Sequence, residues 1–527
     1  MLAFTENGIF NLSIANVIIS IFLLSVTWFV VHTVRKAIFT SLWNVPGPLL
    51  CAFTNFPLYY YTYCGKYHEF TLALHKKYGD VVRVGVNQIS LANVDELRRV
   101  MSTHNFPKGK SYERGLFWAP STFSTTDPEL NKLRRRQTGV VYSMPAMRAF
   151  EDAVIENGAL SLIEAWDNNI AESREKSDQA LVNYFYDFHG IAFDIIGALG
   201  FGCNFNIVRG GDWTIIDKIH KLTNLISIKS ISPAIARLKW LFKDLYSALD
   251  YMMSLADNAQ IQRRKDNKSG CQKPHVDILQ KLIEAHDPST GEKLSDTCMI
   301  AEILLLLVAG TDTSSNTLSY TLIHLLNHPN ILERLQREIR QEFPDISTPI
   351  RFAEAREKLP YLTAVFLESM RVNSAVAGYL PRRVPDEGTV LLNKYQIPGG
   401  SEIILSLAAC HHDKNVWERA EYFDPERFMD NKQGEIRAKN VLVFGHGVRM
   451  CLGRNLAWME LYTIMANILR KYKIELPSNS PYGPHRLSNN LDAVGEPENI
   501  PSKVFITSTP IDPRRNCRIL ISNANLS

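Results

Sequence analysis

Apolar residues fall into three kinds of run along this chain, and each kind predicts a different element. An uncharged stretch extends from Asn7 to Val34, and most of Ile9–Val31 within it is apolar. From about residue 90 to about residue 375 the pattern is mostly helical, and its longest uninterrupted stretch is Ser295–His328. Short apolar runs between turn residues, as in Gly378–Gly400, predict small β-sheets. The pattern therefore predicts a mainly α protein with a smaller β portion.

The first apolar run is long enough to cross a membrane, because a helical span needs about 20 residues. A cleaved signal peptide is the alternative, but it requires a basic start and a small-residue cleavage site after a shorter apolar core. Here Glu6 precedes the run, and Arg35 and Lys36 follow it. We therefore expect an uncleaved transmembrane helix within residues 1–36, with the body of the protein on the cytoplasmic side.

Val45-Pro46-Gly47-Pro48 can continue neither a helix nor a strand. It predicts a proline-rich hinge over residues 37–50, followed by a single domain over residues 51–527. The first element expected in that domain is a β-hairpin with strands at Val81–Gly85 and Ile89–Leu91.

The stretch Ser295–His328 predicts a central helix of about 50 Å. A second membrane span is the alternative, but Glu302 and Asp312 leave too short an apolar run. The tract Ala309–Ser314 then places poor helix formers in mid-helix. It predicts either a kinked core helix, in which hydroxyls bond to backbone carbonyls, or a functional site where Gly310 opens a groove.

Composition narrows the class of protein without identifying it. The 527 residues are 46% hydrophobic and 21% charged, which suits a globular protein with a large core. A net charge of +4 gives no case for nucleic acid as a partner. The eight cysteines form no Cys-x-x-Cys pair, so the sequence indicates neither a disulfide framework nor a zinc site.

One cysteine follows a glycine-rich loop and precedes the predicted helix Leu456–Leu469. The loop reads Phe444-Gly445-His446-Gly447-Val448-Arg449-Met450-Cys451-Leu452-Gly453. Nearby cations and a helix N-terminus lower the pKa of a thiol, and Arg449 and Arg454 flank Cys451. Glycines also let the backbone approach a flat group closely. Cys451 is therefore either an ordinary buried thiol or the axial ligand of haem iron.

The spacing Phe-x-x-Gly-x-Arg-x-Cys-x-Gly, filled by Phe444, Gly447, Arg449, Cys451 and Gly453, resembles the haem-binding signature of the cytochrome P450 monooxygenases. The chain is most similar to microsomal fungal members. The resemblance implies the cytochrome P450 fold, with a triangular helical body, a long central helix and small β-sheets. It also implies haem b as the cofactor, and hydroxylation or epoxidation of a lipophilic substrate with dioxygen, with a steroid or terpenoid as the expected substrate.

The resemblance also implies roles for residues outside the loop. Asp312 and Thr313 match the family's oxygen-activation pair, which delivers protons. Arg449, Arg135 and Arg382 would pair with haem propionates, although the basic run around Arg135 also suits a solvated helix face. Asn131 stands where the family has His or Trp.

Two further groups complete the implied site. Glu368 and Arg371 by themselves suit an exposed salt bridge, but with Arg427 they match a buried charge network behind the cysteine loop. The substrate pocket would include Phe117, Trp118, Ala309, Val376 and Tyr379. The adjacent His411 and His412, expected in a strand, would point to opposite faces and so form no metal site.

No Gly-x-Gly-x-x-Gly fingerprint follows a predicted strand, so we expect no nicotinamide site in this chain. The resemblance implies electrons from NADPH through NADPH-cytochrome P450 reductase at the endoplasmic reticulum membrane, with cytochrome b5 as a further donor. Arg134, Arg136 and Arg454 would dock such an acidic partner. Two other functions stay open: a haem-thiolate isomerase or dehydratase that acts on peroxides without a reductase, and a non-catalytic membrane-anchored haem or ligand carrier.

Overall fold

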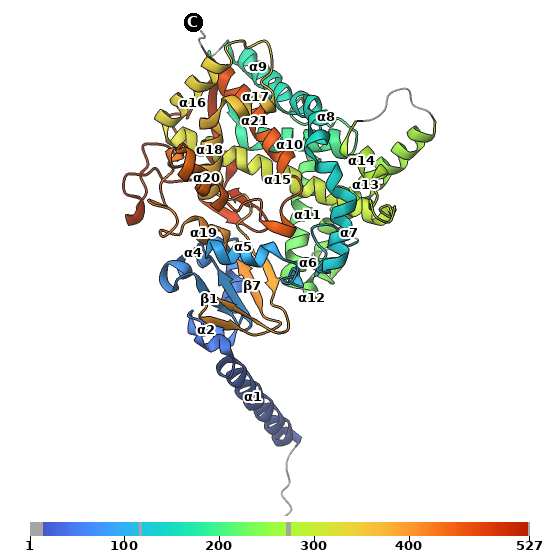
Figure 1. The fold of residues 1–527 in the computed structure, drawn as a ribbon, viewed down its shortest axis with the longest axis vertical. Helices are drawn as coiled ribbons and strands as arrows, with labels where there is room; N and C mark the ends of the chain where they lie inside the picture. The colour runs from blue at the N-terminus through green and yellow to red at the C-terminus, as the bar shows by residue number, and fades with distance from the viewer. Residues whose placement is uncertain (1–13, 115–118, 176, 270–275, 525–527) are drawn as a thin grey trace, which may run out of the picture.

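The computed structural model describes residues 14–114, 119–175, 177–269 and 276–524 (Figure 1). Helices form a broad body with a small sheet at one end, and helix α1 (Ile14–Ile38) projects from that end. The predicted mainly α class with a smaller β portion is confirmed. From Val17 to Ile38, α1 is long and apolar enough to cross a membrane, and its large apolar side chains are exposed.

Helices account for most of the body. In chain order they are α2 (Leu49–Phe53), α3 (Phe56–Tyr63), α4 (Tyr67–Tyr78), α5 (Val94–Ser102), α6 (Ser111–Arg114), α7 (Pro128–Thr138), α8 (Met144–Ile155), α9 (Ser161–Ser173), α10 (Tyr184–Gly200), α11 (Thr214–Ile231), α12 (Pro233–Ala236), α13 (Lys243–Lys268), α14 (Ile278–Glu284), α15 (Asp296–Asn327), α16 (Pro329–Glu342), α17 (Phe352–Lys358), α18 (Pro360–Val372), α19 (Leu407–His411), α20 (Asn431–Asn440), α21 (Arg454–Lys471) and α22 (Pro513–Asn516). Short 3-10 turns at η5 (Pro425–Phe428) and η6 (Gly447–Arg449) lie before α20 and α21.

Helix α15 is the central element and runs through the middle of the body beside α10 (Figure 1). The side chain of Ser295 caps its start by accepting a hydrogen bond from the Cys298 amide. Most residues of α15 are buried against other helices of the body. The alternative of a second membrane span is therefore wrong, because protein rather than lipid covers this helix.

Four small sheets complete the fold. The predicted hairpin pairs β1 (Val81–Gly85) with β2 (Gln88–Leu91), and β2 continues into β7 (Glu402–Leu405) and β4 (Pro381–Arg383) in the order β1-β2-β7-β4. The other strands are β3 (Ala180–Asn183), β11 (Arg518–Asn523) and β8 (Tyr472–Glu475) in one sheet, with hairpins of β5 (Thr389–Leu391) with β6 (Tyr395–Ile397) and of β9 (Ser502–Val504) with β10 (Ser508–Pro510). The segment 378–400 thus contributes to two sheets, not to one.

The chain between α1 and the body packs against the first strand. Leu42 and Val45 are buried in the cluster of apolar residues around β1, β2 and β7. The amide of Arg83 donates to the Pro46 carbonyl at 2.7 Å, and its guanidinium donates to the Ala37 carbonyl at 3.2 Å. These contacts fix the direction in which α1 leaves the body.

Candidate active site around Cys451

The loop before α21 is shaped by its glycines. Gly445 and Gly447 have φ angles of +71° and +62°, which L side chains rarely adopt. A Cβ atom on Gly447 would also lie 2.5 Å from the Cα atom of Ser102 in α5. The Cys451 amide donates to the Phe444 carbonyl at 2.8 Å and closes the loop. This glycine-dependent path holds Cys451 directly before the first turn of α21.

The thiol of Cys451 lies open to a cavity of about 320 Å³ inside the body. Phe444 and Gly453 of the loop also line this cavity, and Ala309 and Thr313 of α15 line it as well. The structure therefore places the cysteine loop and the small-residue tract of α15 around one internal space.

The ionisation of Cys451 differs from the sequence-based expectation. Burial raises the pKa of its thiol, while the amide of Gly453 and the positive charges of Arg135 and Arg454 lower it less. The expected fall in pKa near cations is therefore outweighed by loss of water. A coordinated metal ion deprotonates a thiol outright, so ligation would supply what the protein charges do not.

Four basic side chains line the same cavity. Each donates a hydrogen bond to a main-chain carbonyl: Arg135 to Met450, Arg382 to Pro381, Arg449 to Thr125 and Lys108 to Phe123. Among the described residues, none of the four forms a salt bridge with a carboxylate. This concentration of positive charge without acidic partners suits an anionic ligand.

Arg449 lies in surroundings that are unfavourable to its positive charge. Burial and repulsion from Arg382 and Arg135 lower its pKa to about 10. Its Nη2 atom is buried and has no hydrogen-bond partner within the part of the chain that the structure describes. The chemistry of this donor set, a thiol facing a cavity rimmed by guanidinium groups, fits an iron porphyrin with two carboxylates.

Lys108 was not among the residues that the sequence singled out. It is only 7% exposed, and its ammonium lies 3.8 Å from the centre of the Phe123 ring. Burial and the three neighbouring arginines lower its pKa well below its usual value. No motif surrounds Lys108, so only its position in the fold could reveal that it faces the cavity.

Asp312 and Thr313 are adjacent on α15, and they share one cavity but each also lines a cavity that the other does not. Thr313 lines the Cys451 cavity, and its hydroxyl donates to the Ala309 carbonyl at 2.7 Å. Asp312 is 5% exposed and lines a separate cavity of about 580 Å³. Both residues border a third cavity of about 370 Å³. The structure thus puts the hydroxyl next to the thiol side and the carboxyl on the other flank of the helix.

Gly310 lines the Cys451 cavity, so the groove expected there stays a prediction, and the glycine also has a packing role. A Cβ atom at this position would lie 2.6 Å from Cδ1 of Ile196 in α10. The glycine therefore allows α10 to pack closely on α15. The alternative of hydroxyl groups bonding back to carbonyls is observed in this tract at Thr313, and also at Ser315, which donates to the Thr311 carbonyl.

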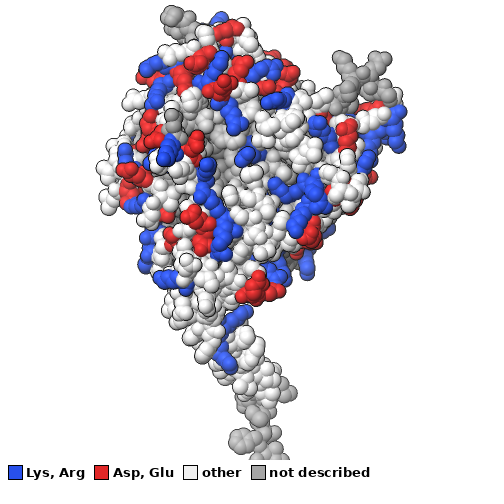
Figure 2. Space-filling model, viewed as in Figure 1, with Lys and Arg blue, Asp and Glu red and all other residues white. Residues whose placement is uncertain are grey.

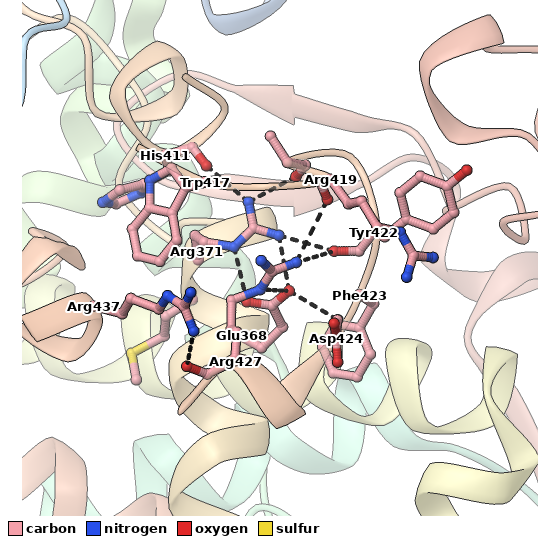
Figure 3. Close-up of polar contacts among 12 residues, drawn as sticks. Glu368, Arg371, His411, Trp417, Arg419, Tyr422, Phe423, Asp424, Arg427 and Arg437 are labelled. Atoms are coloured by element: carbon pink, nitrogen blue, oxygen red, sulfur yellow. Dashed lines mark hydrogen bonds and ion pairs between the residues drawn. The ribbon is translucent and has the colours of Figure 1, made fainter. Parts of the chain in front are cut away.

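A buried charge network joins α18 to the segment that precedes the cysteine loop in the chain (Figure 3). Arg371 donates from Nε and Nη2 to the two oxygens of Glu368, each at 2.8 Å, and Arg427 of η5 donates to Glu368 at 3.0 Å. The remaining donors of Arg371 reach the carbonyls of His411, Ala420 and Tyr422. The three charged residues that the sequence grouped together therefore meet, and they hold the segment 411–428 that precedes the loop.

The expected pocket residues divide between two cavities. Ala309 and Val376 line both the Cys451 cavity and the cavity of about 370 Å³, whereas Tyr379 lines only the latter. The Tyr379 hydroxyl donates to Glu402 at 2.8 Å. Phe117 and Trp118 lie outside the described residues.

The basic helix α7 differs from its expected role in partner docking. Arg134 is buried and donates to Gln137 and to the sulfur of Cys298, so the expectation that it docks a partner is wrong. Arg136 forms two hydrogen bonds with Asp287, at 2.9 and 3.0 Å.

Asn131 is also buried, and its amide donates to the Thr122 carbonyl rather than into the Cys451 cavity. Helical periodicity turns one face of the basic run inward.

The histidine pair at 411 and 412 lies at the end of helix α19, not in the expected strand. His411 is buried, and its Nε2 accepts a hydrogen bond from the Leu442 amide at 3.0 Å. His412 contacts the Ala408 carbonyl through Nδ1. Each ring is thus used to support neighbouring backbone.

Comparisons with known proteins agree with this geometry. The family model described as Cytochrome P450 matches residues 45–493. Cytochrome P450 monooxygenase helB1 of Aspergillus fumigatus is 31% identical over 524 residues, covering 97% of this chain and 86% of that protein. Benzoate 4-monooxygenase bphA of Aspergillus niger is 29% identical, with coverage of 83% of this chain and 89% of that protein.

A solved structure shows the same fold. The heme domain of cytochrome P450DA superimposes with a TM-score of 0.74 at 19% identity. The match covers 92% of this chain and 98% of the solved chain. At this identity the likeness concerns the arrangement of helices and sheets.

Proposed function

From the premise that this chain belongs to the cytochrome P450 family, we propose that it is a membrane-anchored haem-thiolate monooxygenase that oxidises a lipophilic substrate with electrons from a reductase. The observation that carries the proposal is one internal cavity that joins Cys451 to four basic side chains, none of which has a carboxylate partner among the described residues. A thiolate and a set of unpaired cations are what an iron porphyrin with two propionates requires.

We assign haem b to this cavity. Cys451 would be the axial ligand of the iron, and Arg135, Arg382 and Arg449 would bind the propionates, together with Lys108. Phe444, Gly447 and Gly453 shape the loop that carries the ligand. The buried network of Glu368, Arg371 and Arg427 supports that loop from behind and takes no part in the chemistry.

When bound, thiolate-ligated haem supplies the activation of dioxygen. In the net reaction one oxygen atom enters a C–H or C=C bond of the substrate and the other leaves as water, which consumes two electrons and two protons. The chain itself moves those protons. Burial raises the pKa of Asp312, so its carboxyl group holds a proton closer to neutral pH than an exposed aspartate does. The adjacent Thr313 hydroxyl, at the Cys451 cavity, would pass that proton on.

The substrate proposal rests on the cavity of about 370 Å³ that adjoins the Cys451 cavity. Its wall is largely apolar, and Ala309 and Val376 border both spaces. At one end Gln88 donates to Tyr379 and Glu402, while the Oε1 atom of Gln88 is buried and has no partner within the described part of the chain. A rigid apolar molecule with one hydroxyl group suits this lining, which favours a steroid or terpenoid. Phe117 and Trp118 would complete the pocket.

The membrane proposal rests on α1 and its surroundings. Arg35 and Lys36 occupy its last turn, so the positive-inside rule puts the body on the cytoplasmic side of the endoplasmic reticulum membrane. Helices α2 and α12 lie at the end of the body from which α1 projects, and they expose Leu49, Leu50 and Ile235 (Figure 1). This end of the molecule shows few charges, whereas both signs are scattered over the body (Figure 2). Residues 1–36 would form the anchor, 37–50 the hinge and 51–527 the haem domain.

Electrons would come from NADPH-cytochrome P450 reductase on the same membrane face, with cytochrome b5 as a further donor. Of the three arginines expected to dock such a partner, Arg454 is the one that lies exposed beside the cysteine loop. Docking through exposed charges weakens as salt rises.

The decisive experiment replaces the thiolate ligand. Cys451→Ser should retain the fold but lose the red-shifted Soret band of the ferrous carbon monoxide complex, because an alcohol does not push electron density onto iron as a thiolate does. Wild-type product formation should require NADPH and reductase. Turnover of a peroxide substrate without reductase would instead show an isomerase or dehydratase.

A second variant separates an enzyme from a carrier. Thr313→Ala removes the hydroxyl that we place in the proton path, and a lost proton-transfer group typically costs about 100-fold or more in rate. Product formed per NADPH consumed should fall, while the carbon monoxide spectrum stays unchanged. If Thr313→Ala forms as much product per NADPH consumed as the wild type does, this role for Thr313 is ruled out.

A further inference from the structure

Three potential metal ligands meet on the flank of α15 that faces away from Cys451. They are His189 of α10, His220 of α11 and Asp312 of α15, and one ligand atom from each lies within 4.8 Å of the others. All three line the cavity of about 580 Å³. The residues are far apart in sequence, so the packing of three helices creates this cluster.

The carboxylate of the cluster lacks the partners that a buried charge requires. Asp312 is 5% exposed, and its Oδ1 atom is buried without a hydrogen-bond partner among the described residues. Its Oδ2 atom accepts a long contact of 3.5 Å from the Thr507 hydroxyl. Buried carboxylates are normally paired, multiply hydrogen-bonded or bound to a metal ion. The free oxygen therefore points to a missing positive ligand.

The two imidazoles are suited to complete a metal site. The Nδ1 atom of His189 bonds to the Phe185 carbonyl at 2.8 Å, which fixes the ring, and no described residue hydrogen-bonds to its Nε2 atom. A backbone carbonyl in this position is the usual support of a metal-binding histidine. The His189 and His220 rings lie with their centroids 6.3 Å apart, so both imidazoles belong to one cluster. His220 is half-buried, at the side of the cluster nearer the solvent.

We propose that His189, His220 and Asp312 form a binding site for a divalent cation of the zinc class, with its fourth position open to the adjoining cavity. Two imidazole nitrogens and one carboxylate oxygen are a typical three-ligand set for Zn²⁺, whereas Ca²⁺ and Mg²⁺ prefer sites built from oxygen atoms. Zinc bonds of about 2 Å require the ligand atoms to approach one another by about 1 Å. The cavity beside them leaves room for that movement.

Metal binding at this site has a consequence for turnover, and this part rests on the proposed function. A cation that takes Asp312 as a ligand removes its carboxyl group from proton transfer to Thr313. Zinc should therefore slow product formation reversibly, without displacing haem. The site lies on the other flank of α15 from the cysteine loop, so the carbon monoxide spectrum should not change.

Equilibrium dialysis tests the site without any need for activity. Untagged, haem-loaded full-length protein is stripped with a chelator and dialysed against micromolar ZnCl₂, and zinc is measured relative to haem iron by elemental analysis. The wild type should bind one tight zinc ion per iron. His220→Ala and His189→Gln should each lose that ion, because each removes one of three protein ligands.

The matched control is His286→Ala, which removes an exposed histidine far from the cluster in sequence and should retain the bound zinc. The carbon monoxide spectrum of every variant confirms that its haem domain is folded.

Equal zinc binding by the wild type and His220→Ala would overturn the site. If wild-type zinc binding depends on His220 but added zinc leaves product formation unchanged, the link to Asp312 is overturned. Absence of any reductase-supported turnover would count against the proposed monooxygenase and not against the metal site.

Discussion

Two regions of this molecule bury charged side chains, and they treat them in opposite ways. Behind the cysteine loop, both oxygens of Glu368 accept hydrogen bonds, and the side-chain N–H groups of Arg371 are directed to Glu368 and to three carbonyls. On α15 and beside it, Asp312, Asn316 and Glu460 each keep a buried polar atom without a partner among the described residues. The first region is complete without a ligand, whereas the second is not.

This difference separates side chains that hold the backbone in place from side chains that interact with ligands. A saturated network fixes one arrangement of the backbone, because every donor or acceptor that moves would lose a partner. Unsatisfied buried groups cost stability, and proteins keep them where ligands, protons or ions must interact. Hydrogen-bond saturation therefore distinguishes the network of Glu368, Arg371 and Arg427 from Asp312, which we propose acts on protons and on a cation.

The largest effect should come from breaking the saturated network. Glu368→Ala leaves Arg371 and Arg427 as buried cations without their carboxylate, which typically costs about 3–5 kcal/mol. We expect little or no folded, haem-loaded protein, measured by the carbon monoxide spectrum per unit of protein. Glu426→Gln, which breaks an exposed pair with Arg334, should cost less than about 1 kcal/mol. Similar yields from both variants would remove the distinction between the two regions.

An intermediate effect with the opposite sign is expected at Glu460 of α21. Burial raises its pKa from 4.5 to about 8, and Ser314 opposes the shift. Between these values the folded state holds a proton that the unfolded chain has released, so stability falls as pH rises. Glu460→Gln should be more stable than the wild type at pH 8, and its advantage should shrink by about 3 kcal/mol toward pH 5. Thermal unfolding at both pH values measures this, and an advantage independent of pH would contradict it.

The smallest of the three effects concerns Arg449, whose Nη2 atom has no partner among the residues that the structure describes. Arg449→Met removes a buried cation that two other arginines repel, so the haem-free chain should unfold at the same temperature or higher. The loaded protein should lose haem about tenfold faster to a haem-scavenging protein, since a charge-assisted bond contributes about 1.5–3 kcal/mol. If the variant destabilises the haem-free chain and leaves haem loss unchanged, Arg449 is structural.

The sequence predicted the elements that depend on local signals. The turn residues around Val81–Leu91, the Ser295 cap and the glycine spacing of the cysteine loop each determine structure over a few residues. The grouping of Glu368, Arg371 and Arg427 came from resemblance to a family, because a lone Glu-x-x-Arg has no such specificity.

Other features depend on packing between distant segments. Arg134 and Arg136 are two residues apart, yet one is buried and the other exposed, because neighbouring helices cover only one face of α7. No sequence spacing marks Lys108, His189 or His220, because the residues that they approach lie on elements distant in sequence. The direction of the pKa shift of Cys451 could not be predicted from the sequence either, because burial raises this pKa and nearby positive charges lower it.

The network in Figure 3 also determines which positions before the cysteine loop can be substituted without disturbing the fold. In the segment before the cysteine loop, the arginines bind the carbonyls of His411, Glu418, Ala420 and Tyr422, and no side chain of these four residues. A carbonyl is supplied by any amino acid. The two arginines and one glutamate therefore set the path of that segment largely through main-chain groups, so we expect its exposed positions, such as Glu418, to tolerate substitution while Cys451 keeps its place.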